Sequence, residues 1–119
     1  HQTVPIIRDF DLLRTGRHFR LSETCKAVVG RDSNDNEKIL AAIGAGETSL
    51  RWMDGAGPLV LLVGEPDETA IRQAGRILLR YTKVTKGASA CLSLQTDGAR
   101  SEIEVVNDLL EDELERLRV

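Results

Sequence analysis

The chain has 119 residues, of which 41% are hydrophobic and 29% are charged, and its formal net charge at pH 7 is −3. This length supports one domain with one hydrophobic core. The sequence contains no run of about 18 apolar residues and no signal-peptide pattern, so we expect a cytoplasmic protein without a membrane partner.

The first patterned segment, KAVVGRDSNDNEKIL, predicts a strand, a glycine turn and a helix. Ala27–Val29 is an apolar strand run, and Gly30 allows the backbone to turn sharply. A polar residue between positions 32 and 34 can cap the helix, and Glu37 completes a capping-box pattern with Asn34. The segment therefore places a helix N-terminus directly after a buried strand.

Arg31 lies at the mouth of this turn and makes it a candidate phosphate site. A helix N-terminus presents free N–H groups and a partial positive charge, and an arginine adds a charge-assisted donor. Asn36 either donates to a phosphate or sugar oxygen or only satisfies backbone groups in the first helical turn. The basic run Arg14–Arg20 joins the site if its strand lies beside the next one. Neither the GxGxxG nor the GxxxxGK[ST] spacing is present, so a small phosphate-ligand domain is an alternative interpretation.

The rest of the chain alternates paired strands with helices. We expect strands at Ser49–Met53 and within the run PLVLLVG, a helix from Glu68 to about Thr85 capped by Asp67, strands at Ala88–Leu94 and Ser101–Val106, and an acidic helix from about Asn107. The fold class is therefore α+β, a single domain in the order β-α-β-β-α-β-β-α. We expect one mixed β-sheet with helices packed mainly on one face.

Several of these motifs, taken in order, resemble a known family. VGRDSNDNEKI, the lone Trp52 followed by GPLVLLVG, and AGRILLRYTKVTKGASACLSL are similar to the RNA-binding module NFACT-R, in its second subtype. That subtype resembles an appendage of bacterial PP-loop proteins related to the tRNA thiouridine synthases MnmA and ThiI. The resemblance implies tRNA or another structured RNA as the partner, with a PP-loop domain attached or associated.

The resemblance covers residues 12–106, which leaves residues 1–11 as a lead-in or linker and residues 107–119 as a C-terminal acidic helix. Gly30, Asn36 and Glu37 match the family's glycine-to-helix motif, and Trp52 matches its tryptophan. Gly57 and Pro58 match its turn in altered form. NFACT-R proper carries histidines beside the tryptophan and after this turn, where this chain has Met53, Asp54 and Leu59.

Basic residues concentrate in two segments despite the negative net charge. Residues 101–119 carry seven acidic and two basic side chains, so the first hundred residues have a net charge of +2. The predicted RNA-contact set comes from these two segments and the helix start: Arg14, Arg17, Arg20, Arg31, Asn36, Arg72, Arg76, Arg80, Lys83 and Lys86.

The second segment predicts an arginine ridge, defined as Arg72, Arg76, Arg80 and Lys83. At about 100° per residue these four side chains share one side of a helix, away from the apolar stripe. Like charges at this spacing repel one another, whereas a face that only keeps a protein soluble mixes signs. The ridge is therefore either a polyanion-binding face or a solvated helix face.

Other functional classes have less support in the sequence. Aromatic residues make up 3% of the chain, so no stacking platform is expected beyond Trp52, and a tryptophan at such a position is more often a core residue than a stacking one. His1 and His18 are the only histidines, and no catalytic motif, metal site or cofactor motif is present, so we expect no enzyme activity from this chain alone and no cofactor. Cys25 alternates with Ala27 and Val29, which directs it toward the core and argues against a sulfur-transfer role.

The sequence thus indicates a non-catalytic RNA-binding accessory domain, with tRNA and thiolation resting on the resemblance alone. The main alternative is a protein-interaction or dimerisation module that uses apolar residues of the C-terminal helix, Leu109, Leu110, Leu114 and Leu117. We favour intramolecular packing of this stripe because a chain of this size needs the buried area. The sequence does not define the oligomeric state.

Overall fold

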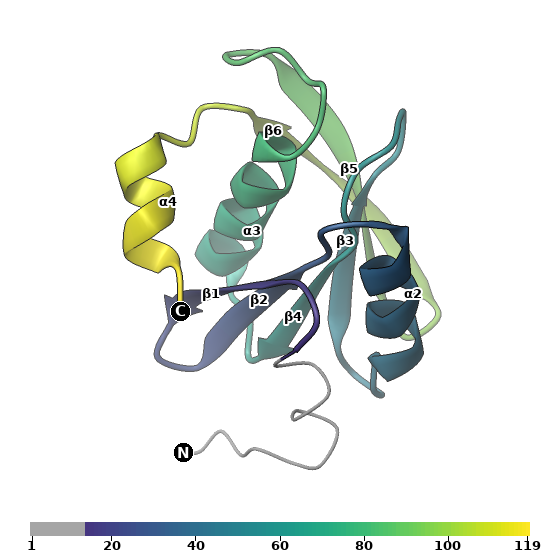
Figure 1. The fold of residues 1–119 in the computed structure, drawn as a ribbon. Coiled ribbons are helices and arrows are strands. Elements are labelled where there is room, and N and C mark those ends of the chain that lie inside the picture. The colour runs from purple at the N-terminus through teal and green to yellow at the C-terminus, as the bar shows by residue number, and fades with distance from the viewer. Residues whose placement is uncertain (1–13) are drawn as a thin grey trace.

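The computed structural model describes residues 14–119 as a six-stranded sheet with three helices (Figure 1). The elements in chain order are β1 (Arg17–Ser22), β2 (Cys25–Val29), α2 (Ser33–Ala42), β3 (Thr48–Trp52), β4 (Val60–Gly64), α3 (Glu68–Arg80), β5 (Ser89–Thr96), β6 (Ala99–Val106) and α4 (Glu111–Leu117). The predicted α+β class and order are confirmed, with β1 as an additional first strand. The lead-in residues 1–11 lie outside the described residues.

The strands are ordered β1-β2-β4-β3-β5-β6, and every neighbouring pair is antiparallel. The expectation of a mixed sheet was therefore wrong. Helix α2 returns the chain so that β2 and β3 run in the same direction, but β4 lies between them and pairs with both. The two strands that run in the same direction are therefore never hydrogen-bonded to each other, because an antiparallel strand separates them.

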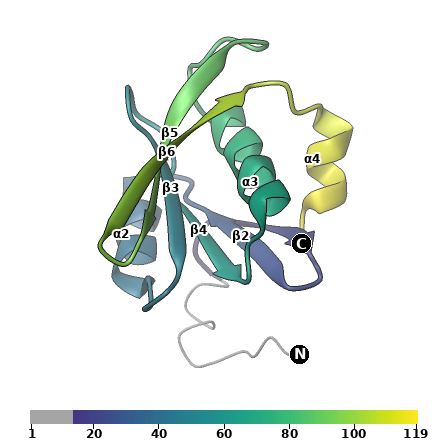
Figure 2. The same cartoon turned by 180° about the vertical axis from the view of Figure 1, so that it is seen from behind.

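Helices cover both faces of the sheet, with two helices on one face and one on the other. Helices α3 and α4 lie on one face, and α2 lies alone on the other, as the views from both sides show (Figures 1 and 2). The larger core joins α3 and α4 to the sheet and includes Phe19, Ile77 and Leu92, and the smaller one joins Ile39 of α2 to Val28 and Leu61. Alternation along β2 produces both clusters, because Val28 faces α2 while its neighbours Ala27 and Val29 face α3.

The N-caps agree with the sequence patterns more closely than the helix ends do. Asp67 accepts a hydrogen bond from the backbone N–H of Ala70 and caps α3 as predicted. The predicted end of that helix at Thr85 was wrong, because α3 ends at Arg80. The hydroxyl of Thr82 donates to the carbonyl of Leu79 at 2.8 Å and accepts from the N–H of Val84 at 3.2 Å, which turns the chain out of the helix.

The C-terminal segment belongs to the larger core. Leu109 and Leu114 are 1% and 2% exposed and contact α3 and the sheet, which confirms intramolecular packing, while Leu110 remains 50% exposed. The last residue, Val119, donates its N–H to the carbonyl of His18 on the edge strand β1 at 2.9 Å. Helix α4 therefore contributes to the fold at both of its ends.

Candidate nucleic-acid interface

Strand alternation divides the first basic segment between the two faces of the sheet. Arg17 lies on the α3 face of β1 with Phe19, and its guanidinium carbon sits 4.5 Å from the centre of the Tyr81 ring. Arg20 lies on the opposite face, where Lys26 is its partner across the strand pair. The segment from residue 14 to residue 31 is therefore two patches rather than one.

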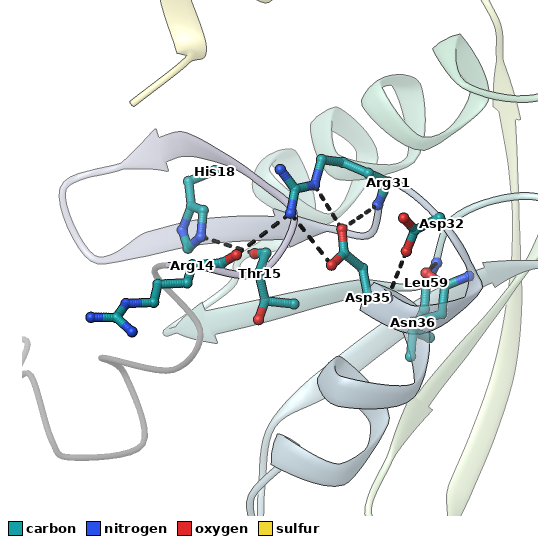
Figure 3. Close-up of polar contacts among 8 residues, drawn as sticks. All are labelled: Arg14, Thr15, His18, Arg31, Asp32, Asp35, Asn36 and Leu59. Atoms are coloured by element: carbon teal, nitrogen blue, oxygen red, sulfur yellow. Dashed lines mark hydrogen bonds and ion pairs between the residues drawn. The ribbon is translucent and has the colours of Figure 1, made fainter.

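Arg31 is held by Asp35, which lies in the first turn of α2 (Figure 3). The Nε of Arg31 donates to the carboxylate at 2.7 Å, and the backbone N–H of Arg31 donates to it at 3.0 Å. The hydrogen bond from the Arg31 side chain is the largest influence that lowers the pKa of Asp35, and the same contact raises the pKa of Arg31. Asp35 is buried, so this pair fixes the guanidinium in place and offsets its charge.

The start of α2 is organised by side chains that satisfy backbone groups. Asp32 is the N-cap and accepts from the N–H of Asp35 at 2.8 Å, so the predicted pairing of Asn34 with Glu37 is replaced by a cap two residues earlier. The Oδ1 of Asn36 accepts from the N–H of Leu59 at 3.0 Å (Figure 3). Asn36 therefore satisfies a backbone group, although one on the segment before β4 and not in the first helical turn. Donation from Asn36 to a phosphate stays a prediction.

Gly30 explains how Asn36 reaches across to β4. A Cβ built on this buried glycine would lie 2.0 Å from Oδ1 of Asn36, so any other residue would displace the amide from the N–H of Leu59. The N–H of Gly30 in turn donates to the carbonyl of Leu59 at 3.1 Å. The motif thus joins the end of β2, the start of β4 and the first turn of α2 into one rigid corner.

A pocket of about 390 Å³ lies at this corner. One wall is Arg17 with Tyr81, a second is Arg31 with the first residues of α2, and a third is the turn at residues 56–58. The structure brings Arg17, Arg31 and Asn36 together here, in agreement with the condition that the first strand pairs with the second. The sequence analysis missed Tyr81 as a pocket residue, because a helix extended to Thr85 places Tyr81 inside the helix, whereas Tyr81 is the C-cap of α3.

Trp52 supports the turn that forms part of this pocket. A Cβ on Gly55 would lie 2.4 Å from Cζ3 of the indole, so the turn backbone rests against the ring. The indole is half-buried and packs on the larger core with its remaining surface. This placement favours the core interpretation, and stacking of a base on Trp52 stays a prediction.

The arginines of the predicted ridge face the acidic C-terminal segment. Arg76 Nε lies 2.7 Å from Asp108 and its Nη2 lies 3.5 Å from Glu113, and Arg80 pairs with Glu111. Arg80 also donates to the carbonyl of Leu109 at 3.4 Å.

Arg72 has weaker partners than the other two. It pairs with the exposed Glu68 at 3.5 Å and donates to the carbonyl of Glu104 at 3.3 Å. Lys83, the fourth member of the ridge, lies beyond the end of α3. Contact of these residues with RNA stays a prediction. Within the domain, the three arginines join α3 to β6 and to the C-terminal segment.

Five other basic residues lie on segments that meet at or follow Tyr81, the C-cap of α3. We define the basic end as Arg14, Arg17, Arg31, Lys83 and Lys86. Within residues 14–119, only Arg31 of this set forms an ion pair. Its Nη2 donates to the carbonyl of Arg14 at 3.5 Å, and the Arg14 side chain points away from the pair (Figure 3). Lys83 and Lys86 follow Tyr81 on the loop that contacts the turn at Gly57 through Thr82.

Comparison with protein-family models assigns the chain to a family. Residues 16–118 match the model of the NFACT protein RNA binding domain, its second subtype. The chain belongs to this family. The family is an RNA-binding domain, and the sequence resemblance to NFACT-R is thereby confirmed. Among curated proteins, no sequence matches the chain.

A solved structure has the same fold as this NFACT RNA-binding domain. The C-terminal part of the fibronectin/fibrinogen-binding protein from Streptococcus suis superimposes with a TM-score of 0.75 over 88% of this chain, at 12% sequence identity. The chain spans about half the length of that structure, covering 49% of it. At this identity the likeness establishes the fold alone.

Both cysteine thiols have a raised pKa. Burial raises the pKa of Cys25 to about 11, and desolvation together with Glu102 and Glu104 raises that of Cys91, so neither thiol is activated as a nucleophile. Within residues 14–119, no three acidic, cysteine or histidine side chains are placed to hold a metal ion. None of the described helices is both long enough and apolar enough to span a bilayer.

Proposed function

We propose that the domain binds tRNA through phosphate contacts made by the basic end, and that it serves an attached or associated PP-loop tRNA thiolation enzyme. The family supports RNA as the partner. The choice of tRNA and of a PP-loop partner rests on the similarity of residues 12–106 to the appendage of the thiouridine synthase-like proteins. We propose a cytoplasmic location on the same ground.

The observation that carries the choice of surface is the contrast in ion pairing. Arg14, Arg17, Lys83 and Lys86 have no carboxylate partner among the described residues, so no carboxylate within residues 14–119 competes with a phosphate backbone for them. Phosphate contacts by lysine and arginine supply most of the sequence-independent affinity for nucleic acids. Arginine adds a planar fork that can bind two phosphate oxygens at once.

Charge reversal at the basic end tests the proposal. Replacing Arg17, Lys83 and Lys86 together by glutamate should weaken tRNA binding by about 100-fold at moderate salt. The slope of log affinity against log salt should become shallower by about 2 to 3, since each lost phosphate contact removes about 0.7 to 0.9. Fluorescence anisotropy with labelled tRNA measures both quantities.

A matched control separates local contacts from overall charge. Lys38, Arg100 and Arg116 are exposed, lie on other elements and form no ion pair within residues 14–119. Replacing these three by glutamate changes the net charge by the same amount and should leave the affinity within about threefold, because distant exposed charges are largely screened. Equal losses in the two triple variants would contradict a localised interface.

The thiolation part of the proposal has its own test. An SGGxDS-type PP-loop motif upstream in the full reading frame would support it, and a complete frame without one would overturn that part while leaving RNA binding in place. The dimerisation alternative has less support, because two of the four leucines of the C-terminal stripe are buried within the domain itself.

A further inference from the structure

The pocket at the basic end has features that phosphate binding alone does not require. Its volume of about 390 Å³ falls within the range of small-ligand sites. Part of its lining consists of small or rigid residues, Gly30, Ala56, Gly57 and Pro58. A phosphate held on the surface by arginines would not need a concavity of this volume with an aromatic residue in its lining.

One wall of the pocket presents a stacking surface. The guanidinium of Arg17 lies over the ring of Tyr81, and no carboxylate within residues 14–119 competes for it. A guanidinium backed by an aromatic ring is partly desolvated and keeps its second flat side available. Nucleobases stack on aromatic side chains and on arginine planes in proteins that bind unpaired RNA.

The facing wall supplies polar groups whose positions are fixed. Asp35 orients the guanidinium of Arg31, and the N–H of Leu59 fixes the Oδ1 of Asn36. The amide nitrogen of Asn36 makes no hydrogen bond among the described residues, so it can donate to a base edge or a sugar hydroxyl. The exposed hydroxyl of Ser33 and the carboxylate of Asp32 lie on the same wall.

We propose that this pocket receives one unpaired nucleotide of the bound RNA, with its base stacked on the Arg17–Tyr81 pair and its polar edge facing Asn36. The inference rests on the proposed RNA-binding function and adds a preference for a single-stranded end or an extruded nucleotide. A nucleotide within a continuous duplex cannot enter, because its base remains stacked on both sides.

Two RNA probes of equal phosphate number test the inference. One is an unstructured single strand, and the other is a blunt hairpin whose loop is closed by a non-nucleotide linker. The wild-type domain should bind the single strand about tenfold more tightly than the hairpin, which is the scale of one base-stacking contact. Anisotropy titration gives both affinities.

Variants then separate stacking from charge. Arg17→Lys keeps the charge but removes the flat surface, so the ratio of single-strand affinity to hairpin affinity should fall to about one. Ala56→Phe fills the pocket from an exposed turn position and should have the same effect without any change in charge. Ala41→Phe, at an exposed position on α2 away from the pocket, is the matched control and should keep the preference. Melting curves confirm that each variant is folded.

The outcomes distinguish this inference from the function on which it rests. Equal wild-type affinity for the two probes, or a preference that survives both Arg17→Lys and Ala56→Phe, would overturn the nucleotide pocket. RNA binding by the basic end would still stand if the glutamate triple variant had lost tRNA affinity. Binding of free AMP as tightly as the single strand would also overturn the inference, in favour of a site for a small nucleotide ligand.

Discussion

The α3 arginines (Arg72, Arg76 and Arg80) and the basic end look alike as sequence segments but have different partners in the folded domain. The α3 arginines contact carboxylates and carbonyls of β6 and the C-terminal segment, whereas four of the five residues of the basic end have no carboxylate partner within residues 14–119. A positive charge that is already paired inside the protein gains little from a phosphate. The comparison therefore teaches that pairing, more than the count of basic residues, indicates a polyanion-binding surface.

The largest expected effect concerns the helix that covers the α3 arginines. Leu114→Ala should lower the free energy of unfolding by about 2 to 5 kcal/mol, because a nearly fully buried leucine leaves a cavity in the larger core. Urea denaturation followed by circular dichroism measures the loss. Leu110→Ala is the control on the same segment, and at 50% exposure it should cost less than about 0.5 kcal/mol. Similar costs for the two variants would contradict the packing of α4.

Asp35 is the buried carboxylate that pairs with Arg31 of the basic end, so its removal should lower stability and raise affinity. Asp35→Asn should cost about 1 to 3 kcal/mol of stability, because the N–H and guanidinium of Arg31 lose an ionised acceptor. The same change frees the charge of Arg31 and should strengthen tRNA binding. A variant that loses stability and also loses affinity, while remaining folded, would argue against Arg31 as an RNA contact.

The same carboxylate predicts a pH dependence with a defined sign. The pKa of Asp35 is lowered in the folded domain by its hydrogen bonds from Arg31, so the ionised form favours folding. This contribution is complete above the ordinary carboxyl pKa of about 4 and is lost as pH falls through the lower folded value. Melting temperatures between pH 3 and pH 7 should therefore fall more steeply for the wild type than for Asp35→Asn. Parallel profiles would contradict the assignment.

Arg76 provides a direct comparison with Arg17. Arg76→Ala should cost about 1 kcal/mol of stability, because its side chain is mostly covered and pairs with two carboxylates, and should leave tRNA affinity nearly unchanged. Arg17→Ala should reverse this pattern, with a small change in stability and a clear loss of affinity. Thermal melts give the change in stability of each variant, and anisotropy titrations give its change in tRNA affinity. A greater loss of affinity for Arg76→Ala than for Arg17→Ala would reverse the roles that we assign.

The smallest effect is expected at Arg72, the most exposed of the α3 arginines. Its ion pair with Glu68 is 3.5 Å long and lies in solvent, so Arg72→Ala should change stability by less than about 0.5 kcal/mol. Its affinity for tRNA should fall less than that of Arg17→Ala. A larger loss than at Arg17 would indicate that RNA reaches the exposed end of α3.

The sequence predicted what depends on local pattern. Strand β2, the cap at Asp67 and the inward direction of Cys25 follow from alternation and capping rules, which act over a few residues. The family resemblance was also readable, because its motifs are short and contiguous. These features did not need knowledge of the partners that each segment meets.

The remaining features depend on contacts between distant segments. Ion pairing of the α3 arginines with residues near position 110 bridges about thirty positions, and no local pattern marks it. Likewise, the stacking of Arg17 on Tyr81 requires that β1 pairs with β2 while α3 ends at the same corner. The splitting of the first basic segment between two faces required only recognition of β1, whose alternating Phe19 and Leu21 were the signal.

The most direct test of the central claim is a map of amide signals during titration of the isotope-labelled domain with tRNA. Two-dimensional NMR spectra report each backbone N–H separately, so they compare the two basic regions in one experiment. We predict that shifts and line broadening concentrate at residues 14–17, 30–36, 55–58 and 81–87. Perturbation centred on residues 72–80 and 108–116, with the basic end unchanged, would contradict the account.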